Sequence, residues 1–74
     1  MSDRIRVVFA EDHPLFREGL RSALTHAADL ELVGEATDGA AALALIRSER
    51  PEVAILDIGL PEMDGCAVAR RVRQ

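Results

Sequence analysis

Three acidic residues come directly after two short apolar runs of the chain. Glu11 and Asp12 follow the run 5–10 (IRVVFA), and Asp57 follows the run 53–56 (VAIL). If these runs are neighbouring parallel strands, their carboxyl ends meet at the sheet edge where ligands of such sheets bind. Carboxylates gathered there repel one another unless a cation lies among them, and a few oxygen ligands suit Mg²⁺. A carboxylate beside bound Mg²⁺ can attack a phosphoryl group and become an aspartyl phosphate.

The same acids could also be solvated loop residues or helix caps. Their coincidence at equivalent ends of two strands favours a site. The two histidines are expected to be ordinary residues, His13 at the start of a helix and His26 on a helix surface. Cys66 is expected to be a packing residue, and Asp64 the cap of the helix that contains it.

The elements that position the acids are predicted from hydrophobic spacing and from helix breakers. The β-branched run 5–10 is typical of a strand buried on both faces. Pro14 suits the first position of a helix, because its missing N–H costs nothing there. That helix is predicted to run for about 15 residues. Its apolar stripe would consist of Phe16, Leu20, Ala23, Leu24 and Ala27.

The remainder of the chain repeats this alternation of strand and helix. The helix before Pro51 should end there, since a residue that precedes proline disfavours the α conformation. Strands that alternate with helices predict an α/β fold with a parallel sheet and right-handed crossovers. The predicted elements are a strand over 30–36, a turn and cap at Asp38 and Gly39, a helix over 39–48, a buried strand over 53–56, a loop over 58–64 and a helix that begins near Asp64.

Composition excludes several classes of protein. A chain of 74 residues with 49% hydrophobic and 30% charged residues is typical of one small globular domain. No apolar run reaches the roughly 18–20 residues of a membrane span. Cys66 is the single cysteine, which excludes a disulfide framework and fits a reducing cytoplasm. A net charge of −4 argues against a nucleic-acid-binding surface on this chain.

Two long motifs resemble those of one family. Residues 11–20 (EDHPLFREGL) are similar to the opening of receiver domains of bacterial two-component response regulators, in the form typical of the NarL/FixJ (LuxR-type) transcription regulators. Residues 53–65 (VAILDIGLPEMDG) resemble the phosphoacceptor strand and the loop that follows it. The resemblance extends over the whole chain and implies a flavodoxin-like receiver fold.

The resemblance implies a role for each matching residue. Asp57 would be the phosphoacceptor, which takes a phosphoryl group from a sensor histidine kinase or from acetyl phosphate. Glu11 and Asp12 would hold Mg²⁺ together with Asp57, and the backbone carbonyl of Gly59 would complete the protein ligands. The residues that would fix the geometry of the following loop and helix start are Pro61 and Gly65.

The chain also departs from the family pattern. A complete receiver has five strands in the order 2-1-3-4-5, and this chain would supply three of them in the order 2-1-3. We therefore expect residues 1–74 to form a partial receiver domain. The family's Ser/Thr after strand four, its aromatic switch residue and its lysine after strand five are missing, and the sequence contains no lysine at all.

These departures leave two main hypotheses. In one, the chain belongs to a longer regulator that is phosphorylated and controls transcription through a DNA-binding domain outside this chain. In the other, it is a non-signalling fragment, not stably phosphorylated, that self-associates through the open edge of strand 53–56. A haloacid-dehalogenase type of phosphatase would need an acid where Gly59 stands, so we expect no enzyme.

The kinase is expected to recognise the first helix together with the acidic pocket. The candidate residues for this recognition are Arg17, Glu18 and Arg21. Direct binding of nucleic acid or of a membrane is not expected of this chain.

Overall fold

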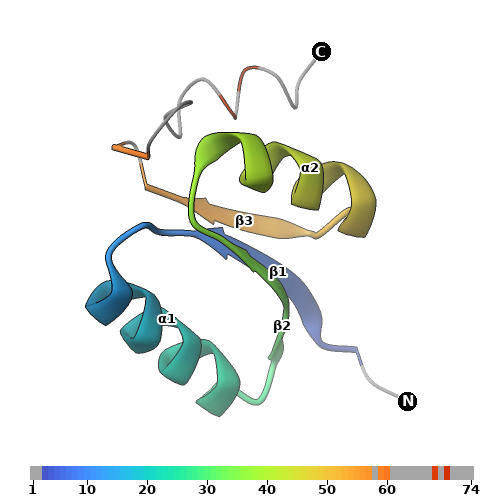
Figure 1. Ribbon diagram of the computed structural model, residues 1–74. Coiled ribbons are helices and arrows are strands. Elements are labelled where there is room, and N and C mark those ends of the chain that lie inside the picture. Colours follow the sequence, from blue (N-terminus) through green and yellow to red (C-terminus); the bar gives the residue numbers. More distant parts are fainter. Residues whose placement is uncertain (1–2, 58, 61–67, 69, 71–74) are drawn as a thin grey trace.

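A parallel sheet with a helix on each face forms the framework of the computed structural model, which describes residues 3–57, 59, 60, 68 and 70 (Figure 1). The predicted order of elements is confirmed. The elements are β1 (Ile5–Ala10), α1 (Pro14–His26), β2 (Leu30–Ala36), α2 (Gly39–Glu49) and β3 (Val53–Leu56).

The three strands lie in the order β2-β1-β3, which confirms the order that the resemblance to receiver domains implied. Both pairs are parallel, and Val7 of β1 lies beside Leu32 on one side and Val53 on the other. The register between β1 and β2 shifts by one residue after Val7, since Val7 pairs with Leu32 whereas the next residue, Val8, pairs with Gly34. Val33 is therefore the extra residue of a β-bulge. The β1 to β3 pairing is regular from Val7 to Ala10.

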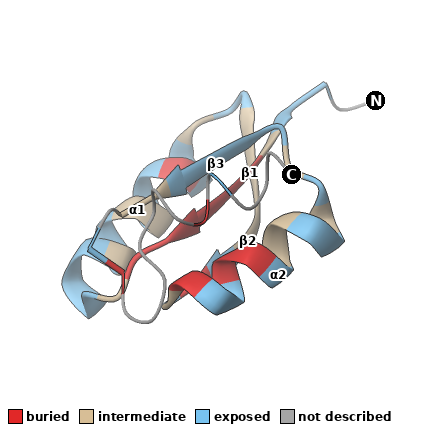
Figure 2. Ribbon diagram, turned by 90° about the horizontal axis from the view of Figure 1, so that it is seen from above, coloured by how far each residue is buried: buried red, intermediate tan, exposed pale blue. Residues whose placement is uncertain are grey.

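The hydrophobic core has two parts, one on each face of the sheet. Val7 and Phe9 pack with Leu24 of α1. On the other face, Ala10 packs against α2 in a cluster that includes Ala36, Ala42, Leu43, Leu60 and Val68. Figure 2 shows β1 buried between its neighbours. The central strand is therefore buried on both faces, as its β-branched run predicted.

Local signals set the helix boundaries. Pro14 opens α1 directly after His13, the N-cap residue. At the start of α2, the Asp38 carboxylate accepts a hydrogen bond of 2.7 Å from the Ala41 N–H, which confirms the predicted cap. Helix α2 ends at Arg50, whose φ of 48° is left-handed, and Pro51 follows. No helix in the described part of the chain is long and apolar enough to cross a membrane.

Two burial predictions were wrong. Phe16 is 61% exposed, and Ala23 is exposed as well. Helix α1 contacts the sheet through Leu20 and Leu24, whereas its first turn lies at the carboxyl edge, where the strands end. Strand β3 was predicted to be buried, yet most of it is exposed. The cause is that β3 is an edge strand, and the cluster beneath α1 draws its residues from β1 and β2 instead.

The predicted loop over 58–64 and the third helix fall mostly outside the described residues. Pro61, Asp64, Gly65 and Cys66 are not described. Of the predicted third helix, Val68 and Arg70 are described, and both are helical.

Candidate functional site

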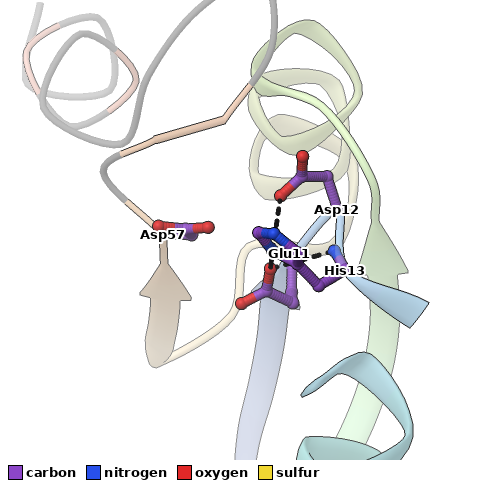
Figure 3. A group of neighbouring side chains, drawn as sticks. All are labelled: Glu11, Asp12, His13 and Asp57. Carbon is purple, nitrogen blue, oxygen red and sulfur yellow. Dashed lines mark hydrogen bonds and ion pairs between the residues drawn. The ribbon is translucent and has the colours of Figure 1, made fainter. Parts of the chain in front are cut away.

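The predicted acids meet at the carboxyl edge of the sheet. The Glu11 N–H donates a hydrogen bond of 3.0 Å to the Ala36 carbonyl, and the Asp57 N–H donates one of 3.2 Å to the Ala10 carbonyl. The first bond joins the end of β1 to the end of β2, and the second joins the end of β3 to the end of β1. One ligand atom each from Glu11, Asp12, His13 and Asp57 lies within 4.8 Å of the others. Figure 3 shows Asp57 facing the other three residues from the end of β3.

Glu11 is the most buried acid of the group, with 8% of its surface exposed. Its Oε2 atom accepts hydrogen bonds of 3.0 Å from both the backbone N–H and the ring Nδ1 of His13. The backbone bond is the main reason that the pKa of Glu11 is lowered, and the bond to the ring adds to it. Glu11 therefore remains a carboxylate despite its burial.

Asp12 has an oxygen that suits a cation. Its Oδ1 atom is buried and, within the described part of the chain, has no hydrogen-bond partner. The His13 Nδ1 lies 3.3 Å away as an ion pair. A buried carboxylate oxygen without a hydrogen bond is costly, and a hard divalent cation would satisfy it. The oxygen-rich group of Glu11, Asp12 and Asp57 thus fits the Mg²⁺ that the sequence predicted.

His13 belongs to this group although the sequence interpretation assigned it only to the helix start. That assignment is confirmed, since His13 is the N-cap of α1. Its ring also contacts the carboxylates of Glu11 and Asp12, and it packs on Phe16 with ring centroids 5.4 Å apart. Contact with Glu11 is the largest reason that the pKa of His13 is raised. The sequence carried no signal that specifies this contact, because the position of the ring depends on the turn between β1 and α1 and on its packing against Phe16.

Gly59 lies next to Asp57, as expected. Its N–H donates a hydrogen bond of 3.0 Å to the Asp57 Oδ1. A Cβ atom at position 59 would lie 3.7 Å from that oxygen, an ordinary contact. The bond holds one carboxylate oxygen of Asp57 in place. The loop residues Pro61 and Gly65 lie outside the described part of the chain.

Comparison with known proteins identifies the family. The response regulator receiver domain matches residues 7–74. The chain is 54% identical over 71 residues to the "Probable transcriptional regulatory protein NarL" of Mycobacterium tuberculosis, an alignment that covers 96% of this chain and 33% of that protein. The chain thus spans about a third of the length of the curated relatives it matches.

Solved structures agree with this match. The signal receiver domain of NarL from Mycobacterium tuberculosis superposes with a TM-score of 0.93 at 54% identity, over 96% of this chain and 57% of that one. A LuxR-family two-component response regulator from Aurantimonas gives a TM-score of 0.88 at 32% identity, over 96% and 51% of the two chains. Because the match runs from β1 to the last residue and the 2-1-3 parallel sheet is that of the flavodoxin-like receiver fold, the chain belongs to the response regulator receiver family.

Proposed function

We propose that Asp57 is the phosphoacceptor of a two-component response regulator and that Glu11, Asp12 and Asp57 hold Mg²⁺ beside it. One observation carries this proposal: in a chain of the receiver family, acids from the ends of β1 and β3 converge within 4.8 Å. The backbone carbonyl of Gly59 would complete the protein ligands. Bound Mg²⁺ would supply positive charge to the oxygens of the phosphoryl group during transfer.

In the transfer step, the free carboxylate oxygen of Asp57 attacks the phosphorus atom of the donor. The new bond joins this oxygen to phosphorus, and the bond between phosphorus and the donor atom breaks. The electron pair of the broken bond leaves with the donor, which is a histidine ring nitrogen of the kinase or the acetate of acetyl phosphate. Gly59 holds the other oxygen of Asp57 through its N–H, so the attacking carboxylate is oriented before the donor arrives.

The sensor kinase is proposed to dock on the first turns of α1, next to the acids. Leu15 is 78% exposed and Phe16 is 61% exposed, which makes this surface apolar and accessible. Of the charged residues predicted to take part in recognition, Arg21 is held by Glu35 through bonds of 2.7 and 2.8 Å. Glu18 is exposed and Arg17 is partly exposed. We therefore propose that Arg17 and Glu18, more than Arg21, determine which sensor kinase binds.

The whole protein is proposed to be a transcription regulator in the cytoplasm whose DNA-binding domain lies outside this chain. The relatives support this proposal, since the curated proteins it matches are named as transcriptional regulatory proteins. The net charge of −4 agrees with a signalling part that does not bind DNA itself. We assign no enzymatic activity to the chain beyond the transfer of a phosphoryl group to Asp57.

Phosphate-affinity electrophoresis after treatment with acetyl phosphate and Mg²⁺ tests this function. Two proteins are compared: the chain 1–74, and a chimera in which residues 1–74 continue into the rest of the Mycobacterium tuberculosis NarL receiver domain. The chimera should give a retarded band that EDTA and Asp57→Asn both abolish. The chain 1–74 should give no stable band, because it contains no lysine to offset the charge of the phosphoryl group. A retarded band that persists in the Asp57→Asn chimera would overturn the proposal.

A further inference from the structure

The ring of His13 contacts two of the carboxylates that we propose as Mg²⁺ ligands. Its Nδ1 atom lies 3.0 Å from the Glu11 Oε2 and 3.3 Å from the Asp12 Oδ1. Figure 3 shows this one ring joined to both carboxylates. An imidazole N–H that donates to a carboxylate oxygen uses the same lone pairs that a bound cation would use. The ring and a divalent cation therefore compete for the same two acids.

The ring is not needed to start helix α1. His13 is the N-cap residue, yet its side chain makes no capping hydrogen bond to the described first turn of the helix. Pro14 follows it, and the fixed φ of proline already favours a helix start. The ring contacts Glu11, Asp12 and Phe16 instead. Its effect is therefore on the acids and not on the helix.

The ring can turn away while Glu11 stays in place. The side chain of His13 is 63% exposed, whereas that of Glu11 is only 11% exposed. The Glu11 Oε2 accepts a second hydrogen bond of 3.0 Å from the backbone N–H of His13. The Glu11 N–H is held by the Ala36 carbonyl. A rotation of the ring into solvent would thus break its contacts with the acids and leave the backbone bonds of Glu11 intact.

We propose that His13 is a positioning residue whose ring competes with Mg²⁺ for Glu11 and Asp12 and turns into solvent when the cation binds. This role rests on the proposed function, because it presupposes the Mg²⁺ site. Mg²⁺ prefers oxygen ligands, whereas imidazole nitrogen suits transition metals. Entry of Mg²⁺ should therefore displace the ring and not recruit it as a ligand. His13 thereby sets the affinity of the acids for Mg²⁺.

Displacement of the ring would also change the surface of the first turn of α1. The His13 ring packs on Phe16 with ring centroids 5.4 Å apart, and Phe16 is exposed. This is the surface on which the sensor kinase is proposed to dock. Binding of Mg²⁺ would thus alter the docking surface through His13, without direct contact between the cation and Phe16.

Isothermal titration calorimetry with MgCl₂ at constant pH tests the competition. His13→Asn removes the ring and supplies a residue that is favoured at an N-cap, so α1 should persist. We expect the dissociation constant for Mg²⁺ to fall about 3–10-fold in His13→Asn, and His13→Ala should change it in the same direction. A role for the ring in holding the acids in place predicts the opposite sign, because loosened acids would bind Mg²⁺ more weakly.

His26→Asn is the matched control. His26 is exposed at the other end of α1, where its Nδ1 lies 2.7 Å from the Ser22 carbonyl oxygen. This variant should bind Mg²⁺ as the wild type does. Each substitution is made both in the chain 1–74 and in the chimera with the rest of the NarL receiver domain, and circular dichroism reports whether each protein folds. The test therefore does not depend on whether the chain 1–74 folds alone.

NMR spectra of the aromatic rings report the displacement itself. Addition of MgCl₂ to the wild type should shift the ring resonances of His13 and Phe16 and leave those of His26 in place. In His13→Asn the shift of Phe16 should be much smaller. His13 resonances that do not respond to Mg²⁺ would overturn the proposal.

The calorimetry separates this proposal from the Mg²⁺ site on which it rests. Equal or weaker Mg²⁺ binding in His13→Asn, together with weakened binding in Asp12→Asn, would overturn the role of His13 and leave the site intact. Absence of Mg²⁺ binding in the wild type and in every variant would overturn both.

Discussion

His13 is the residue that organises the acids at the carboxyl edge. Its backbone N–H and its ring both bond to the Glu11 Oε2 at 3.0 Å, and its ring lies 3.3 Å from the Asp12 Oδ1. These contacts lower the pKa of Glu11 and raise that of His13. The buried Glu11 is thereby kept ionised. Glu11, Asp12 and Asp57 together form the carboxylate group that we propose as the Mg²⁺ site.

Asp12→Asn should weaken Mg²⁺ binding. The substitution removes one negative charge from the group and replaces a buried oxygen that has no hydrogen bond within the described residues. We expect the dissociation constant for Mg²⁺ to rise by about 10-fold or more, measured by isothermal titration calorimetry. Asp29→Asn is the matched control. Asp29 is exposed and lies where β1 and β2 begin, at the end of the strands opposite to the acids. Equal Mg²⁺ affinity of the wild type and the Asp12→Asn variant would show that Asp12 does not bind Mg²⁺.

The sequence could predict which acids meet, but not how they are held. Glu11, Asp12 and Asp57 follow from the rule that parallel strands end at one edge, and the structure brings them together. The position of the His13 ring depends on the turn between β1 and α1 and on its packing against Phe16. Sequence spacing does not specify either feature.

At the scale of the elements, an ion pair joins helix α1 to edge strand β2. Arg21 donates hydrogen bonds of 2.7 and 2.8 Å to the two carboxylate oxygens of Glu35. Bonding to Arg21 is the main cause of the lowered pKa of Glu35. Because the pKa is lower in the folded state, this carboxylate stabilises the fold above its ordinary pKa of 4.5. That contribution is lost as the pH falls through the lowered value.

Glu35→Gln should therefore cost stability in a pH-dependent way. Chemical denaturation should show a lower free energy of unfolding for Glu35→Gln than for the wild type near neutral pH. The difference should shrink as the pH falls through the lowered pKa of Glu35, because the carboxyl group then becomes protonated in the folded state as well. Asp3→Asn, at an exposed position before β1, is the control substitution. A difference in the free energy of unfolding between wild type and Glu35→Gln that stays constant as the pH is lowered would contradict this assignment.

Gly34→Ala should disturb the packing of α2 on β2. A Cβ atom at position 34 would lie 2.5 Å from the Leu45 Cδ1, so the Leu45 side chain must move within the cluster on that face. We expect a loss of about 1–3 kcal/mol in the free energy of unfolding. In a Leu45→Ala background the same change should cost much less, because the clashing atoms are gone. Equal costs in the two backgrounds would show that the clash is not the cause.

The order of the elements could be predicted, whereas the burial of their faces could not. Alternating apolar runs and breakers indicated the strands, both helices and a parallel sheet, whereas the order 2-1-3 was implied by the resemblance to receiver domains. The apolar pattern also predicted a buried Phe16 and a buried β3, and both predictions were wrong. A hydrophobic pattern in the sequence indicates which residues are suited to a core. Whether another element covers them depends on tertiary packing.

The whole chain belongs to the receiver family but spans only part of the length of its relatives. The chain covers 57% of the solved NarL receiver domain and 33% of the NarL protein. It contains the end of the sheet where the acids converge. The acids at the strand ends form the acceptor site that we propose.

Mapping the phosphorylated residue tests the central claim most directly. The chimera of residues 1–74 with the rest of the NarL receiver domain is treated with acetyl phosphate and Mg²⁺ and then reduced with borohydride, which converts an aspartyl phosphate to homoserine. Mass spectrometry of the peptides should locate homoserine at position 57 and at no other aspartate, and EDTA should abolish it. A modified residue at Asp12 instead of Asp57, or labelling that does not require Mg²⁺, would contradict the account.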